Sequence, residues 1–94
     1  MTVLEVTRFA VAPERVGELL ATRGAMLADF QADRSGFIRA QLVSMPGGQL
    51  LDVVEWHTRE DYAASRAKGA NLPGVAAFFG AIDHLVSAEC GEVV

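Results

Sequence analysis

The chain has 94 residues, of which 51% are hydrophobic, and its twelve acidic and eight basic side chains give a net charge of −4. This length fits a single domain, residues 1–94, and the lack of a basic cluster argues against nucleic acid or an anionic membrane as a partner. The lone cysteine, Cys90, excludes a disulfide within one chain, and no Cys and His spacing predicts a metal site.

The N-terminal residues lack a basic region followed by a long apolar run, which argues against a signal peptide. No stretch of about 18 uninterrupted apolar residues predicts a membrane span. We therefore expect a cytoplasmic protein. So small a domain has difficulty hiding this much apolar surface, which favours self-association.

The first half of the chain predicts a strand and then a helix. Residues 2–11 are rich in β-formers, and Ala12-Pro13-Glu14 starts a helix that runs to about Asp33. Ser35-Gly36 ends it. Its apolar stripe consists of Val16, Leu19, Leu20, Leu27 and Phe30. Its charged residues are expected to form an ordinary solvated face: Glu14, Arg15, Glu18, Arg23 and Asp29.

Two strands follow, joined by a turn. Residues 37–45 predict a strand, and Pro46-Gly47 supplies the centre of a type II turn. Residues 49–56 predict a third strand that is apolar on both faces and so is covered on both sides. Strict alternation places one set of side chains of the second strand on a common face: Phe37, Arg39, Gln41 and Val43.

The last third predicts a broken helical region and a final strand. Thr58 is a good N-cap for a helix to about Lys68, and residues 69–74 interrupt it. A short helix then carries Phe78 and Phe79, and residues 83 to about 89 form a fourth strand. The order βαββαβ predicts a ferredoxin-like α+β fold with a four-stranded antiparallel sheet. Both helical regions cover one face, and a second copy of the chain is the simplest cover for the other.

Three local patterns and this order of elements carry a family resemblance. The patterns are Ser35-Gly36-Phe37, the segment Glu55-Trp56-x-Thr58-x-Glu60-x-Tyr62, and the broken second helical region. Over nearly its whole length the chain resembles the antibiotic biosynthesis monooxygenase family of the dimeric α+β barrel superfamily. The resemblance implies a homodimer whose sheets close into a barrel, with a pocket between sheet and helices in each protomer.

The resemblance also implies a chemistry. Members of this family that oxidise polyketide-derived phenols do so without metal, flavin or haem, because the substrate anion itself gives an electron to oxygen. Their pocket has a tryptophan where this chain has Trp56, a tyrosine at Tyr62 and an asparagine where this chain has Asp52. They also use an arginine in the second helical region, and none occurs here between Gly69 and Ile82.

A haem-degrading branch of the superfamily fits less well. It needs an asparagine on the first strand, where this chain offers Thr7, and a tryptophan in the second helix, where it offers Ser65. It also needs a histidine ligand, and none lies between Thr58 and Asp83. We therefore expect no bound cofactor.

Cofactor-free oxygenation requires a dry pocket, hydrogen-bond donors aimed at the developing oxyanion, and a base. Trp56 and Tyr62 can donate, although core anchors at the strand–helix corner are the simpler explanation for both. Arg39 or Arg8 can hold an anionic substrate. Phe78 and Phe79 are core residues or the roof of a pocket.

The candidate bases are carboxylates and histidines. Glu5 and Asp52 each interrupt an apolar strand, so each must be paired, solvated or protonated, and pairing with Arg8 or Arg39 is the simplest outcome. Asp52 is the better catalytic candidate because it replaces the family's asparagine. His84 either lines the pocket as a base or pairs at the rim, whereas His57 is expected in solvent.

The leading hypothesis is a cofactor-independent monooxygenase-like enzyme that acts on a small aromatic metabolite, with Trp56, Tyr62 and Asp52 as catalytic residues. Arg39, His84, Phe78 and Phe79 would bind the substrate. One alternative is a non-catalytic protein that binds a small ligand, and a weaker one is a cofactor-free isomerase or cyclase. Convergence of Asp52, Arg39 and His84 on a cavity with Trp56 would favour an enzyme.

Overall fold

A four-stranded antiparallel sheet forms one layer of the molecule. A computed structural model describes all residues, 1–94, with strands β1 (Val3–Ala10), β2 (Phe37–Ser44), β3 (Gln49–Trp56) and β4 (His84–Glu92). Their spatial order is β2-β3-β1-β4, and every neighbouring pair is antiparallel. The predicted ferredoxin-like α+β fold is confirmed.

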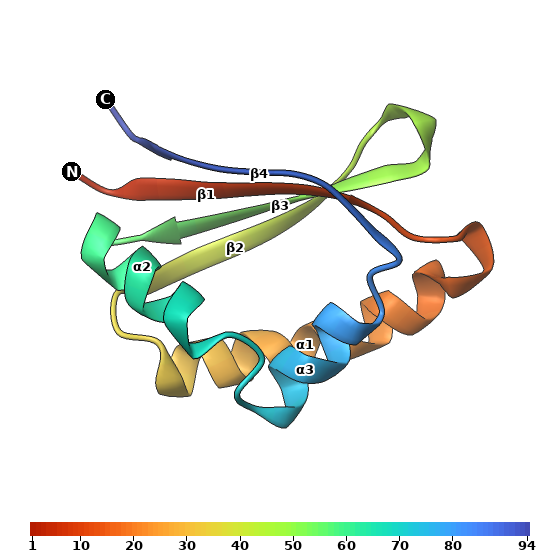
Figure 1. The fold of residues 1–94 in the computed structure, drawn as a ribbon, viewed down its shortest axis with the longest axis horizontal. Coiled ribbons are helices and arrows are strands. Elements are labelled where there is room, and N and C mark those ends of the chain that lie inside the picture. Colours follow the sequence, from red (N-terminus) through yellow and green to blue (C-terminus); the bar gives the residue numbers. More distant parts are fainter.

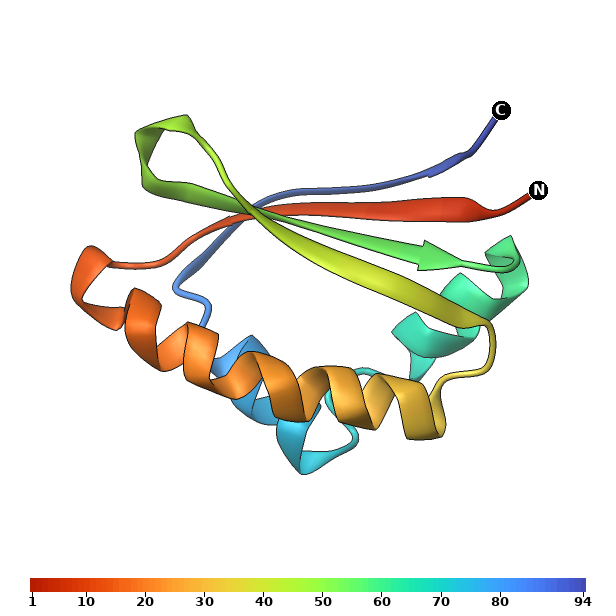
Figure 2. The same cartoon turned by 180° about the vertical axis from the view of Figure 1, so that it is seen from behind.

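The helices form the second layer, on one face of the sheet (Figure 1). A short 3₁₀ turn, η1 (Pro13–Arg15), precedes the long helix α1 (Val16–Asp33). The predicted break in the second helical region is confirmed, because α2 (Arg59–Lys68) and α3 (Pro73–Gly80) are separate helices. Figure 2 shows α3 lying against α1, and α2 near the end of the sheet where both termini lie. None of the helices combines the length and apolar character needed to cross a membrane.

The core lies between these layers. Inward side chains of β1 and β3 alternate with outward ones, and the inward set meets one stripe of α1 and one face of α3. Twelve buried hydrophobic residues form one cluster: Val3, Phe9, Val11, Leu19, Met26, Phe30, Leu50, Val54, Trp56, Val75, Phe78 and Ala81. Leu20, predicted for this stripe, is instead half exposed, and Met26 takes part in its place.

A β-bulge at Ile38 changes the alternation along β2. Phe37 is paired with Trp56, but the next pair in register is Arg39 with Glu55, so one extra residue is inserted. Phe37 therefore packs on the core together with Ala40, whereas Arg39 faces away. The prediction that Phe37 shares a face with Arg39 is wrong, because strict alternation takes no account of a bulge.

Local turn chemistry behaves as predicted. Gly47, in the middle of the short 3₁₀ turn η2 (Pro46–Gly48), has φ 81° and ψ 13°, a left-handed conformation that favours glycine. The Thr58 hydroxyl accepts a hydrogen bond from the Asp61 amide at 3.0 Å and so caps α2. Both features fix where neighbouring elements begin.

The second face of the sheet has no helix over it (Figures 1 and 2). The outward side chains Leu51 and Val53 of β3 are half-buried, as are Leu4 and Val6 of β1. The prediction that β3 is covered on both sides therefore does not hold within a single chain.

Candidate functional site

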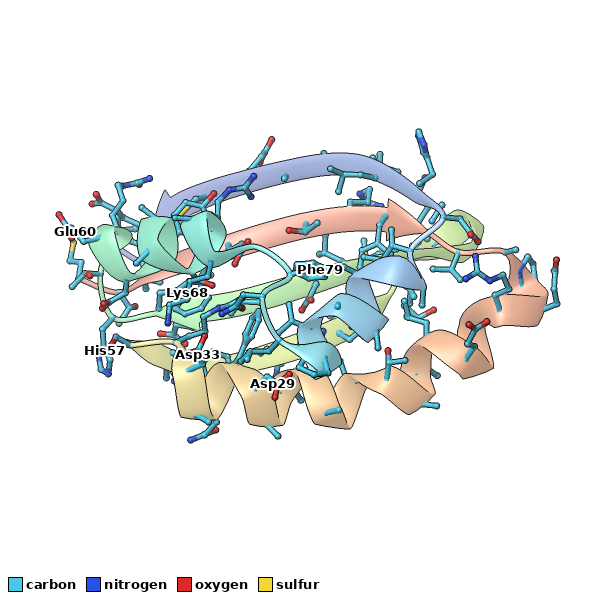
Figure 3. All side chains as sticks on the ribbon, turned by 60° about the horizontal axis from the view of Figure 1, so that its bottom comes forward. Asp29, Asp33, His57, Glu60, Lys68 and Phe79 are labelled. Carbon is cyan, nitrogen blue, oxygen red and sulfur yellow. The ribbon has the colours of Figure 1, made fainter.

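A cavity of about 290 Å³ lies between the sheet and the helices α1 and α3. We call it the main cavity. Its volume is near the lower end for small-molecule sites. Nine lining residues are hydrophobic: Phe9, Met26, Phe30, Val54, Phe78, Phe79, Ile82, Leu85 and Ala88. Four are polar or charged: Glu5, Thr7, Asp52 and Arg66. Figure 3 shows Phe79 where α3 faces the sheet.

Glu5 is the carboxyl group in this cavity without a close cationic partner. The alternation of β1 turns it inward, where its side chain is 18% exposed. Its Oε1 accepts a hydrogen bond from Trp56 Nε1 at 3.1 Å, and the nearest cation is Arg66 Nη1, 4.0 Å from Oε2. Burial raises the pKa of Glu5, and the Asp52 charge raises it further, although the Trp56 hydrogen bond and Arg66 oppose the rise. A carboxyl with a raised pKa in an apolar cavity is suited to proton transfer.

Asp52, the carboxylate favoured from the sequence, also lines the cavity but is already paired. Arg23 Nη1 and Nη2 donate to its two oxygens at 2.7 and 2.8 Å, and both side chains are largely buried. The Arg23 guanidinium also lies 5.1 Å from the centre of the Phe78 ring. Asp52 is therefore one half of a fixed ion pair in the cavity wall.

The prediction that Arg23 belongs to the solvated face of α1 is wrong, because its side chain is largely buried against Asp52. The helical spacing of the sequence does indicate a buried position for Arg23. Positions 19, 23, 26 and 30 fall on one helical stripe, and Leu19, Met26 and Phe30 are core residues. A charged residue on an apolar stripe predicts a buried partner, which here is Asp52.

Trp56 is fully buried and does not line the cavity. Its ring centroid lies 5.8 Å from that of Phe30 and 5.7 Å from that of Phe37, so it is a core anchor. Its indole N–H nevertheless holds Glu5, which connects it to the cavity. Tyr62 is half-buried against the core, with the Arg66 guanidinium 5.9 Å from its ring centre, and it does not line the cavity either.

The predicted substrate-binding residues divide into two groups. Phe78 and Phe79 line the cavity, as does Asp52. Arg39 is 70% exposed on the opposite face of the sheet, where its Nε donates to Glu55 at 2.9 Å, and His84 is exposed at the start of β4. The convergence of Asp52, Arg39, His84 and Trp56 on one cavity does not occur. His57 is in solvent, as expected (Figure 3).

Arg34 is a buried charge that the sequence did not single out. Its side chain is 1% exposed and donates to Asp33 and Asn71 through Nη1, to Ser65 Oγ through Nε and to the Gly69 carbonyl through Nη2. These bonds tie the end of α1 to the segment after α2. Hydrogen bonds from Asn71 and Lys68, with a further one from Arg34, lower the pKa of Asp33. Asp33 and Lys68 lie close together in Figure 3.

Asp29 fixes the roof of the cavity, and its assignment to a solvated face is also wrong. Its Oδ2 accepts hydrogen bonds from the amides of Gly74 and Val75 at the start of α3, at 2.8 and 3.2 Å. A carboxylate at this end of a helix satisfies free amides and interacts favourably with the positive end of the helix dipole.

No group of three or more His, Cys, Asp or Glu side chains is placed to hold a metal ion.

Solved structures with this fold include proteins named for antibiotic biosynthesis. A protein from Bordetella bronchiseptica with the provisional name antibiotic biosynthesis monooxygenase has a TM-score of 0.82 and 14% identity, over 99% of this chain and 97% of its own. A Caulobacter crescentus protein with the same provisional name has a TM-score of 0.75 and 14% identity, over 99% and 90%. The chain thus has the α+β fold of these proteins.

One such structure has a more definite name. SnoaB from Streptomyces nogalater, described as a cofactor-independent oxygenase, has a TM-score of 0.67 and 23% identity, over 96% of this chain and 88% of its own. No protein-family model matches the sequence, and no curated protein matches it. The resemblance inferred from the sequence is therefore confirmed at the level of the fold.

Proposed function

We propose that the main cavity binds a small aromatic phenol or quinol and that the protein oxidises it with molecular oxygen and no bound cofactor. The observation that carries this proposal is Glu5, a carboxyl with a raised pKa inside a mainly apolar cavity. The fold shared with SnoaB, an oxygenase by name, supports the same chemistry.

Glu5 would act as the base. It takes the hydroxyl proton of the bound phenol, and the apolar walls keep the resulting anion out of water. The anion gives one electron to oxygen, and the substrate radical and superoxide combine to form a carbon–oxygen bond. The distal oxygen of this peroxide anion then takes the ring proton and leaves as hydroxide, which breaks the oxygen–oxygen bond and gives a quinone. The hydroxide released takes the proton held by Glu5, so phenol and oxygen yield quinone and water.

The other candidate residues then have supporting roles. Trp56 positions Glu5 through its N–H, and Asp52 with Arg23 forms a fixed charged wall. Phe78 and Phe79 supply aromatic surface to the substrate ring, and Tyr62 supports Arg66 from outside the cavity. Arg39 and His84 have no part in this scheme, because neither lines the cavity.

Two other functions have an observation in their favour. The predominance of apolar lining residues suits a protein that only binds a small ligand. The presence of one base also satisfies what a cofactor-free isomerase or cyclase needs, since Glu5 can remove a proton and return it elsewhere. Oxygen consumption separates the first proposal from both.

We also propose that the chain forms a homodimer through the uncovered face of the sheet. The half-buried Leu4, Val6, Leu51 and Val53 and the exposed Val43 support this, because a single chain leaves them without a covering layer. Pairing two such faces uses the same surface on both copies.

Oxygen uptake with a panel of anthrones, naphthols and quinols tests the enzymatic proposal. We expect wild-type protein to consume oxygen with at least one of these substrates, and Glu5→Gln to lower kcat about a hundredfold or more. Glu60→Gln is the matched control, since Glu60 is exposed on α2 and forms no ion pair. Equal rates for wild type and Glu5→Gln would remove Glu5 as the base, and binding without oxygen uptake would favour a binding protein.

A further inference from the structure

A second cavity of about 230 Å³ adjoins the main one. It is lined by seven residues, four of which also line the main cavity: Glu5, Phe30, Arg66 and Phe79. The other three are Arg34, Ser65 and Gly69. We call it the polar cavity, because only two of its lining residues are hydrophobic, against nine of thirteen in the main cavity. A molecule that spans the shared residues would meet apolar walls at one end and polar walls at the other.

The polar cavity carries an excess of positive charge in a chain whose net charge is −4. Two arginines line it against one carboxyl group, that of Glu5. Asp33 balances the charge of Arg34 through a 2.9 Å contact. Arg66 has no comparable partner, since its nearest carboxylate oxygen, on Glu5, is 4.0 Å away.

The hydrogen-bonding groups lead to the same conclusion. The guanidinium of Arg66 makes no hydrogen bond, although it has five N–H donors, and its side chain is 57% exposed. Arg34 uses Nε, both N–H groups of Nη1 and one of Nη2, which leaves one Nη2 donor. A guanidinium that is free to use two parallel donors matches a carboxylate in shape and charge.

We propose that the ligand is an aromatic acid whose ring occupies the main cavity and whose carboxylate binds Arg66 in the polar cavity. This inference rests on the proposed function only in placing the aromatic ring beside Phe79. Such binding would also affect the base, because Arg66 lowers the pKa of Glu5 and a carboxylate that neutralises Arg66 removes this effect. The acid group of the ligand would therefore make Glu5 a stronger base.

Calorimetric titration with naphthylacetic acid and with its neutral amide tests the proposal, since the two probes differ in charge and hardly in shape. We expect wild-type protein at low salt to bind the acid at least about tenfold more tightly than the amide. Arg66→Gln should lower the affinity for the acid to that for the amide and leave the amide unchanged. Arg59→Gln, on the same helix but outside both cavities, should keep the preference of the wild type.

Four results would overturn the proposal. They are equal binding of acid and amide to wild type, failure of both to bind, equal loss of both in Arg66→Gln, and the same change in Arg59→Gln. The test is independent of turnover. A preference for the acid without oxygen uptake for any substrate would refute the oxygenase but not this subsite, whereas oxygen uptake without the preference would refute only the subsite.

Discussion

At the scale of single residues, Glu5 links the fold to the proposed chemistry. Its carboxyl points inward because alternate residues of β1 share one face, and Glu5 lies between the inward-facing Val3 and Thr7. Burial favours the protonated form, and the indole of Trp56 favours the ionised form. The balance of these effects leaves the pKa of Glu5 above its ordinary value.

The raised pKa of Glu5 has a consequence for stability. A carboxyl whose pKa is higher in the folded chain than in the unfolded chain destabilises the fold once the pH exceeds its unfolded value. Glu5→Gln keeps an oxygen that can accept from Trp56 and cannot ionise. We expect it to raise the free energy of unfolding at pH 7, and the gain to vanish as the pH falls below about 4. Urea unfolding at both pH values measures this, and a gain that persists at low pH would contradict it.

Trp56 should affect the pH dependence of catalysis through Glu5. Its N–H lowers the pKa of that carboxyl, so Trp56→Phe should move the acidic limb of the kcat profile to higher pH. Tyr62→Phe removes only a hydroxyl outside the cavity and serves as the comparison. An unchanged profile for Trp56→Phe would refute the positioning role.

The pair of Arg23 and Asp52 should be costly to break and less costly to replace. Asp52→Leu leaves Arg23 buried without its partner, and we expect a loss of about 3 kcal/mol in the free energy of unfolding. Arg23→Met combined with Asp52→Leu should recover most of that loss, because neither charge remains. Guanidinium unfolding of the three proteins measures the coupling. Equal losses in the single and double variants would show that the pair is not what stabilises this wall.

At the scale of elements, the contact of α3 with α1 sets the roof of the main cavity. Gly74 lies so close to α1 that an added Cβ would be 2.5 Å from the carbonyl oxygen of Ala25. The start of α3 is also bonded to Asp29. This helix end is therefore fixed by both sterics and hydrogen bonds, and Phe78 and Phe79 are positioned from it.

Gly74→Ala should consequently separate the two helices. We expect a loss of roughly 2 kcal/mol in the free energy of unfolding, because a methyl group at Gly74 has no space beside a backbone atom. Gly80→Ala is the matched control, at the other end of α3, where nothing lies within 4 Å of the added Cβ. It should be neutral or stabilise by up to about 1 kcal/mol. Thermal unfolding that gives the same change for both would show that the packing at Gly74 is unimportant.

At the scale of the whole molecule, the uncovered face of the sheet is the surface most suited to self-association. Its apolar side chains are at most half-buried in one chain, whereas the opposite face is covered by the helices and contains the buried core. A stable interface between copies would remove this surface from water.

A charge placed on that face should therefore prevent pairing. We expect wild-type protein to sediment as a dimer at micromolar concentration and Val53→Glu to sediment as a monomer, because an unpaired carboxylate would be buried in the interface. Ala28→Glu adds the same charge on an exposed position of α1 and should leave the dimer intact. A wild-type monomer at micromolar concentration would contradict the proposed assembly.

The sequence by itself determined the order, type and approximate bounds of the elements. Periodicity and turn chemistry are local, so Pro46-Gly47, the Thr58 cap and the break before α3 could be read directly. Glu5 and Asp52 were also recognised as unusual, since a carboxylate in an apolar strand must be paired, solvated or protonated.

Only the tertiary structure decided which partner each charge has, and so which residues form the site. Asp52 pairs with Arg23 from α1 rather than with the strand arginines, and this leaves Glu5 as the carboxyl in the cavity without a close partner. The bulge at Ile38 likewise places Arg39 on the far side of the sheet relative to the cavity. These contacts join residues that are far apart in the chain, and the packing of the helices on the sheet determines them. A local sequence pattern depends only on near neighbours and therefore does not predict them.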